Sequence, residues 1–271
     1  MAKPRAISLH IGVNSLDAKH YAGWKGELKS CENDAEDMAA IARSMGMKPT
    51  LLRTKEATRA NVLAALGEAC TTLKPGDLFF LSYAGHGSQV LDVSGDEMEM
   101  MDETWCLHDG QIIDDEIDTG ITAFAKGVRV LVVSDSTPSG SVVRPHMPEP
   151  DPPPAGLRAR LMPPLVSTKV YHQNEKFYDT LQKNLATAKF PKGGPSIIAM
   201  HACQHNQVAI DGKESGVFTE RLRWLWNQGS YQGNYVRFFD HIVARMPSTQ
   251  TPLMKTYGDV AAFLMQQPFT K

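Results

Sequence analysis

Three short polar loops carry the side chains of this sequence that are best placed to do chemistry. They read YAGHGSQ (83–89), SDSTPSG (134–140) and ACQHNQ (202–207), and each follows an apolar run typical of a buried strand. His86 stands between two glycines in the first loop, and Thr137 lies at the tip of the second. A histidine can act there as a general base, whereas a threonine hydroxyl is a weak nucleophile.

The elements that would position these loops alternate between apolar strands and amphipathic helices, a pattern typical of a mainly parallel sheet. The sequence predicts strands over 5–13, 48–53, 78–84, 128–134 and 195–202, and helices from about 33, from Thr58, and over 168–188, 217–228, 232–245 and 255–267. Asp109-Gly110 predicts a hairpin. Because ligand sites form at the carboxyl ends of parallel strands, the three loops are expected to meet.

Composition excludes several classes of function. The chain has 271 residues, of which 42% are hydrophobic, and a formal charge of −2, so it lacks the basic character of a nucleic-acid-binding protein. We find neither an apolar run long enough to cross a membrane nor a signal-peptide pattern, and expect a cytoplasmic location. The four cysteines form no CxxC pair, so neither a zinc site nor a disulfide frame is indicated.

A proline-rich segment interrupts the alternation of strands and helices. Residues 145–164 contain eight prolines in twenty positions, which disfavours both strand and helix and predicts a long surface loop. We expect one domain over 1–271, in which this loop separates the part at 1–144 from the part at 165–271.

The motif SYAGHGSQ resembles the histidine motif of the caspase-like clan, specifically of metacaspases and bacterial orthocaspases. SDSTPSG, LKSCENDAEDM, DETWCLHDGQIIDDEI and ACQHNQVAIDGKESGVFTERL also resemble family segments, in the family's order. The resemblance implies a caspase-like α/β sandwich, with a mainly parallel central β-sheet and helices on both faces. It makes 1–144 the large-subunit-like part and 165–271 the small-subunit-like part, and it assigns the catalytic histidine to His86.

The same resemblance places Thr137 at the position of the family's catalytic cysteine and Pro138 at that of the histidine beside it. A threonine hydroxyl is a far weaker acid than a thiol and needs a well-aligned base, and proline removes a backbone N–H from the turn. These two replacements predict that peptidase activity is lost. Ser136 and Ser139 flank the site, but alternate side chains on a turn need not face His86.

By resemblance, Cys31, Asp34 and Asp135 line a substrate pocket that binds arginine or lysine, because carboxylates pair with cations. Ala84 replaces a serine found in many relatives, and His205 stands where relatives often have an acidic residue. Both departures weaken the expected preference for basic residues. Cys31 and Cys203 are interpreted as small buried side chains rather than as substitute nucleophiles.

Calcium is the cofactor that the resemblance raises. Asp102, Asp114 and Asp115 resemble three of the carboxylates that hold Ca²⁺ in many metacaspases, since that ion requires oxygen ligands. Arg144 occupies the expected place of the fourth ligand, and a guanidinium there would neutralise the cluster. The acidic run over 95–103 could instead be a solvated loop. We expect no strong calcium site and no required cofactor.

Three functions remain open from the sequence. The first is a pseudoprotease that binds a peptide or protein partner in its cleft without cutting it. The second is an active endopeptidase with a preference for basic residues, slow or using a nucleophile other than cysteine. The third is an interaction domain whose cleft is vestigial. LRARL (157–161), within the proline-rich segment, also offers basic residues that an active caspase-like relative could cut.

Overall fold

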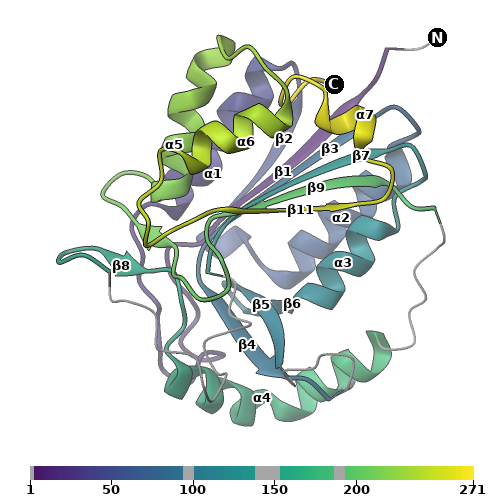
Figure 1. Ribbon diagram of the computed structural model, residues 1–271. Helices are drawn as coiled ribbons and strands as arrows, with labels where there is room; N and C mark the ends of the chain where they lie inside the picture. The colour runs from purple at the N-terminus through teal and green to yellow at the C-terminus, as the bar shows by residue number, and fades with distance from the viewer. Residues whose placement is uncertain (1–2, 94–100, 138–152, 186–192) are drawn as a thin grey trace.

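The computed structural model describes residues 3–93, 101–137, 153–185 and 193–271 (Figure 1). Six strands form a central sheet in the order β11-β9-β7-β3-β1-β2. They are β1 (Ala6–Gly12), β2 (Lys48–Arg53), β3 (Leu78–Ala84), β7 (Arg129–Asp135), β9 (Ser196–His201) and β11 (Leu253–Tyr257). Five of them are parallel and β11 runs antiparallel along β9, so the prediction of a mainly parallel sheet is confirmed.

The inner strands are buried on both faces, as their continuous apolar sequences require. In β3, Phe79 packs into the core on one side of the sheet and Phe80 into the core on the other. The strands pair so that Gly12 lies opposite Ala84, and Ala84 lies opposite Asp135. Three strands therefore finish at the same level, and this common end brings the His86 and Thr137 loops together.

Helices cover both faces of this sheet, as the resemblance implied (Figure 1). On one face lie α2 (Arg59–Thr72) and α3 (Asp114–Thr122), and on the other lie α1 (Cys31–Ser44), α5 (Val217–Trp226) and α6 (Tyr235–Val243). The side chain of Thr58 caps α2 by accepting a hydrogen bond from the backbone N–H of Asn61, as the sequence predicted. Single turns of 3₁₀ helix cover Thr54–Glu56 and Asn227–Gly229.

A second, three-stranded sheet follows directly after His86. It consists of β4 (Gly87–Leu91), β5 (Met101–Leu107) and β6 (Gly110–Ile113), and α4 (Pro164–Leu185) packs against it through Tyr171 and Tyr178. The hairpin predicted at Asp109-Gly110 joins β5 to β6 and is confirmed. This sheet anchors the outer side of the His86 loop.

Two predictions of secondary structure are wrong. The helix expected over 255–267 is instead the edge strand β11 followed by the short α7 (Ala261–Leu264). Within the segment predicted as a surface loop, β8 (Arg158–Ala159) pairs antiparallel with β10 (Ile210–Asp211), and α4 already begins at its last residue. Residues 155–162 of this segment contain no proline, so their backbone N–H groups are available for pairing with another strand.

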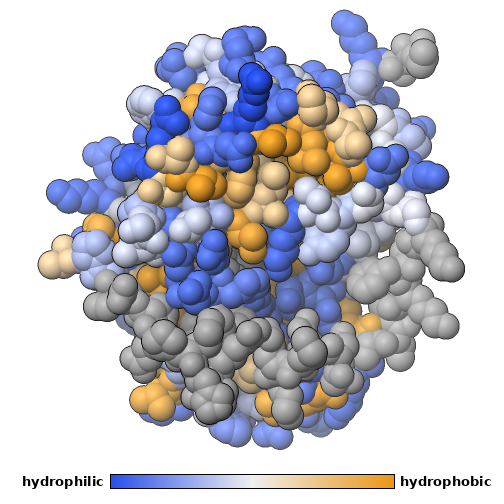
Figure 2. Space-filling view, viewed as in Figure 1, coloured by the Kyte–Doolittle hydropathy of each residue, from blue (hydrophilic) through white to orange (hydrophobic). Residues whose placement is uncertain are grey.

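Apolar residues gather on the molecular surface above β11, toward α6 and α7 (Figure 2). Met265, which directly follows α7, is 68% exposed. Across the residues that the structure describes, no helix has the length and apolar character needed to cross a membrane.

The buried sheet generates a test of the fold. Leu131, in the middle of β7, is fully buried, whereas Leu165, in the first turn of α4, is 80% exposed. Leu131→Ala should lower the free energy of unfolding by about 2–5 kcal/mol, because it leaves a cavity in the core. Leu165→Ala should change it by less than about 0.5 kcal/mol. Denaturant unfolding measures both, and equal effects would contradict this arrangement.

Candidate active site

His86 is held in one orientation at the end of β3. Its Nε2 lies 2.9 Å from the carbonyl oxygen of Gly26, and its ring packs against Trp24 at 4.8 Å between centroids. Because a carbonyl oxygen can only accept, Nε2 carries the proton and Nδ1 is left with a lone pair. Among the described residues, no group hydrogen-bonds that Nδ1. Burial lowers the pKa of His86 to about 4, so the ring is a neutral proton acceptor near pH 7.

Thr137 follows β7 and is buried, with 1% of its surface exposed. Its hydroxyl oxygen accepts a hydrogen bond from the backbone N–H of Ala209 at 2.9 Å. Neither ring nitrogen of His86 forms a hydrogen bond with this hydroxyl. Thr137 lines a cavity of about 110 Å³, whereas His86 lines a separate groove of about 660 Å³. Base and hydroxyl therefore do not form a nucleophile–base pair. Pro138 lies outside the described residues.

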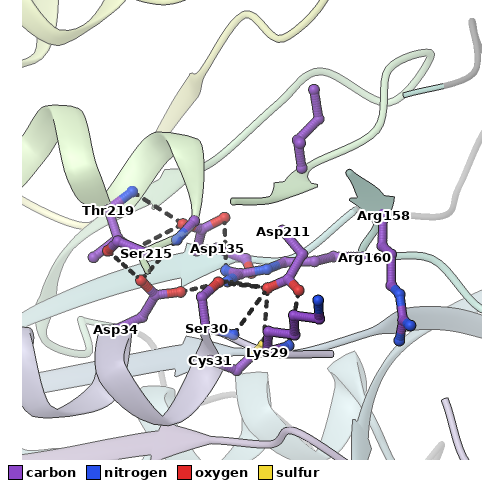
Figure 3. A network of polar contacts seen from close by, with 12 residues as sticks. Lys29, Ser30, Cys31, Asp34, Asp135, Arg158, Arg160, Asp211, Ser215 and Thr219 are labelled. Carbon is purple, nitrogen blue, oxygen red and sulfur yellow. Dashed lines mark hydrogen bonds and ion pairs between the residues drawn. The ribbon is translucent and has the colours of Figure 1, made fainter. Parts of the chain in front are cut away.

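The predicted pocket residues Asp34 and Asp135 do meet, and they surround Arg160 of the same chain (Figure 3). The guanidinium lies 2.5 Å from Asp34, 3.1 Å from Asp135 and 3.1 Å from Asp211, and it is fully buried. It also donates hydrogen bonds to the hydroxyl of Ser30 and to the backbone carbonyl of Asp135. Three acidic residues from separate segments thus converge on one cation.

Each of the three carboxylates also accepts hydrogen bonds from groups other than Arg160. Asp34 accepts from the hydroxyl of Ser215 and the N–H of Gly216, and Asp135 accepts from the N–H and hydroxyl of Thr219. Asp211 accepts from Ser30 and from the N–H of residue 29. The carboxylates are therefore oriented by the fold itself, which makes the pocket preorganised for a cation.

Three carboxylates sharing one cation leave the pocket with an excess of negative charge. Burial raises the pKa of Asp34, with Asp135 adding to the effect, and Arg160 only partly offsets it. Burial also opposes ionisation of Asp211, but Arg160 and hydrogen bonds from Ser30 and residue 29 outweigh it and lower its pKa. The carboxylates overcome the effect of burial on Arg160 and raise its pKa further, so this guanidinium stays charged.

The backbone of Arg160 is held as tightly as its side chain. Its carbonyl oxygen accepts hydrogen bonds from the N–H of Gly87 at 3.1 Å and from the N–H of Thr137 at 3.2 Å. Its own N–H donates to the carbonyl of Ala209 at 2.8 Å. Two converging backbone donors are the arrangement that stabilises an oxyanion during acyl transfer. The carbonyl of Arg160 is thus held by two backbone donors at the level where β3 and β7 end.

Of the other predicted residues, Cys31 contacts this centre: it begins α1, and its thiol lies 4.0 Å from a carboxylate oxygen of Asp211. Burial raises the pKa of this thiol well above the ordinary range, which makes it a poor nucleophile. Ser136 forms a hydrogen bond with Ser134 at 2.8 Å. Cys203 is buried, and its thiol donates to the carbonyl of Gln207. His205 lies 3.1 Å from Glu103 of β5. Ala84 ends β3, and Ser139 lies outside the described residues.

The predicted calcium residues lie at a different place, where β5 and β6 meet α3. Asp102 is buried on β5, and Asp114 and Asp115 open α3. Burial, reinforced by Glu103 and Asp102, raises the pKa of Asp114 well above its ordinary value. Within the described ranges, no three His, Cys, Asp or Glu side chains are arranged to hold a metal ion. Arg144 lies outside those ranges, so the expectation that this chain has no strong calcium site stays a prediction.

Sequence reasoning missed Ser30, Asp211 and, above all, Arg160. The signal for Ser30 was its place one residue before Cys31, at the start of α1. Asp211 stood inside a segment already quoted for its resemblance. For Arg160, the only signal was a basic residue in LRARL, and a basic residue in a proline-rich segment is normally solvent-exposed.

The contact between Gly87 and Thr137 generates a second test. A Cβ at Gly87 would lie 1.8 Å from the carbonyl oxygen of Thr137, so Gly87→Ala forces the two loops apart. We expect the free energy of unfolding to fall by about 2 kcal/mol or more. Gly67→Ala in α2 is the control, because a Cβ there meets nothing within 4 Å. It should stabilise the protein by about 0.5–1 kcal/mol in the same denaturant titration.

The environment of His86 predicts its titration. Nitrogen NMR should show a ring protonated on Nε2 that titrates near pH 4, whereas a midpoint near 6.5 would contradict its burial. Between pH 6.5 and 4 the unfolded histidine binds a proton that the folded one does not. His86 should therefore lower the free energy of unfolding as the pH falls through that window. In His86→Gln, that part of the pH dependence should disappear.

Comparisons with known proteins agree with this geometry. Residues 7–145 match the family model of the metacaspase, peptidase C14 domain. Metacaspase-1A of Neurospora crassa is 34% identical over 154 residues, which cover 51% of this chain and 33% of that protein. Metacaspase-1 of Saccharomyces cerevisiae is 32% identical over 154 residues, which cover 51% and 34%. The aligned part thus spans about a third of these relatives' length.

Two solved structures are similar over nearly the whole chain. Protein GSU0716 from Geobacter sulfurreducens is 47% identical, with a TM-score of 0.89, and the match covers 98% of this chain and 99% of that one. Caspase-1 from Spodoptera frugiperda is 8% identical, with a TM-score of 0.52 over 94% and 87%, and supports the caspase-like fold alone. The common strand ends, the oriented His86 and the family match lead to one assignment: this chain belongs to the metacaspase family, in its peptidase C14 domain.

Proposed function

We propose that this protein is a pseudoprotease, a metacaspase-like domain that recognises an extended basic peptide segment and does not cleave it. Thr137 would stand at the nucleophile position, and Asp34, Asp135 and Asp211 would form the pocket for a basic side chain. Its partner in the cleft would be a peptide or protein segment, and an active caspase-like relative is one candidate. Neither calcium nor another cofactor is needed for such binding.

One observation carries this proposal: the Thr137 hydroxyl is hydrogen-bonded to Ala209 and not to His86. A hydroxyl must lose its proton to a base as it attacks, and an internal threonine has no α-amine to serve it. His86 has a lone pair on Nδ1 but no hydrogen bond to the hydroxyl. These contacts support a site with a proton acceptor and two backbone donors in which the nucleophile is not activated.

The retained parts support recognition of a peptide. Three carboxylates bind a guanidinium in the pocket, and the N–H groups of Gly87 and Thr137 donate hydrogen bonds to a backbone carbonyl. β10 pairs with a strand laid beside it, which is how many domains bind extended peptides. None of these contacts requires a cysteine.

The same two donors also favour a second candidate, a slow endopeptidase with a preference for basic residues. Removing one oxyanion donor costs some enzymes about 100- to 1000-fold in rate, so an intact pair would leave residual catalysis. In that case His86 would have to reach a water molecule or the Thr137 hydroxyl. The two candidates differ in whether the purified protein turns over peptides at all.

Peptide turnover distinguishes the two candidates. The native protein should release no product from peptides with arginine, lysine or aspartate before the cleaved bond, with or without Ca²⁺. Thr137→Cys/Pro138→His should gain cleavage after arginine or lysine, in added peptides or in its own chain, because a thiolate needs less activation. The aspartate peptide is the matched control and should stay uncut. Turnover by the native protein that His86→Ala abolishes would contradict the pseudoprotease and establish the slow peptidase.

A further inference from the structure

A four-residue stretch of this chain, Arg158–Leu161, occupies the cleft. Its first two residues form β8 against β10, with Ala159 opposite Ile210 and Arg158 opposite Asp211. The N–H of Arg160 continues the pairing to Ala209. Leu161 then forms a bridge with Gly87, and the N–H of Met162 donates to the carbonyl of Gly87 at 2.9 Å. The stretch is therefore bonded to both walls of the cleft.

The two arginines of this stretch have different surroundings. Arg158 is exposed and donates to the backbone carbonyl of Glu27, whereas Arg160 is fully buried among the three carboxylates. Figure 3 shows Arg158 extending away from this cluster and Arg160 pointing into it. The stretch thus contains one arginine inside the acidic pocket and, two residues earlier, an exposed arginine with which its effect on binding can be compared.

The groove beside this stretch contains space that the side chains of the stretch do not fill. It measures about 660 Å³ and is lined by Trp24, His86, Arg158, Ala159 and Leu161. The small side chain of Ala159 borders it, so an external peptide could place a larger side chain there. Space for side chains therefore remains, while the acidic pocket and the two backbone donors are taken.

A segment tethered to its own binding site competes with external ligands at a very high effective concentration. Short flexible tethers give millimolar effective concentrations, and overall binding changes by factors of about 100 to 10,000 without any new contact. Arg160 also neutralises carboxylates that would otherwise be buried beside one another without a counter-ion. An external peptide must therefore displace a tethered segment and supply a guanidinium of its own.

We propose that Arg158–Leu161 is the resident ligand of the cleft and closes it to external peptides, with Arg160 as the group that keeps it closed. The inference rests on the proposed function, because a working peptidase would cut this stretch at the carbonyl held between Gly87 and Thr137. Any external ligand is then an extended peptide containing arginine, and it binds only when Arg160 is withdrawn from the three carboxylates.

A binding experiment with three proteins tests the proposal. The probe is a fluorescent, end-blocked peptide with the sequence of residues 157–161, titrated into the native protein, Arg160→Gln and Arg158→Gln. Arg160→Gln should bind it on the order of 100-fold more tightly than the native protein, whereas Arg158→Gln, which removes only an exposed contact of the same stretch, should gain far less affinity. Binding by the native protein as tight as by Arg160→Gln would overturn the proposal, as would no binding by folded Arg160→Gln.

A second measurement on the native protein covers the case in which Arg160→Gln does not fold. In hydrogen exchange, the amides of Arg160 and Met162 should be protected far more than that of exposed Ala155. Exchange as fast as at Ala155 would show that the stretch is not docked and would overturn the proposal. Mass spectrometry of every sample distinguishes failure of this proposal from failure of the proposed function. Hydrolysis of the probe by the native protein would contradict the pseudoprotease function, whereas the binding and exchange results test the resident ligand.

Discussion

The burial of one guanidinium among three carboxylates is the interaction on which this structure depends most. Asp34 comes from α1, Asp135 from the end of β7 and Asp211 from β10, so Arg160 ties together elements that are far apart in the sequence. Removing a buried cation leaves charges that the interior cannot solvate, which is strongly destabilising. The backbone also passes so close to the cluster that residue 216 has no room for a side chain. A Cβ at Gly216 would lie 2.4 Å from a carboxylate oxygen of Asp135 and 2.5 Å from the guanidinium of Arg160.

The same interaction both shapes and fills the cleft. With the guanidinium fixed, the carbonyl of Arg160 falls between the N–H groups of Gly87 and Thr137, next to the loop that orients His86. Three carboxylates, two converging backbone donors and a neutral proton acceptor therefore lie in one part of a metacaspase fold. The Thr137 hydroxyl accepts a hydrogen bond from Ala209 and forms none with His86. The proposed pseudoprotease function rests on this separation of hydroxyl and base, and the ligand proposed for the cleft is part of the same chain.

Strand patterns and motifs predicted much of this from the sequence, because apolar runs determine a parallel sheet and its loops gather at the strand ends. The family resemblance, rather than these patterns, grouped Asp34 with Asp135, and both contact Arg160 in the structure. The patterns missed Arg160 because a proline-rich segment resembles a surface loop, and no local pattern indicates that residue 160 will reach residue 34. The helix expected over 255–267 failed for a similar reason: pairing with β9, a long-range contact, makes LMKTY a strand.

A double-mutant cycle between Arg160 and Asp34 tests the central claim most directly. The free energies of unfolding of the native protein, Arg160→Gln, Asp34→Asn and the double variant give the coupling between the two side chains. The buried ion pair predicts a favourable coupling of about 2 kcal/mol or more, with Asp34→Asn costing less once Arg160 is gone. Effects that add to within about 0.5 kcal/mol would mean that Arg160 does not occupy the pocket in solution, and would contradict this account of the cleft.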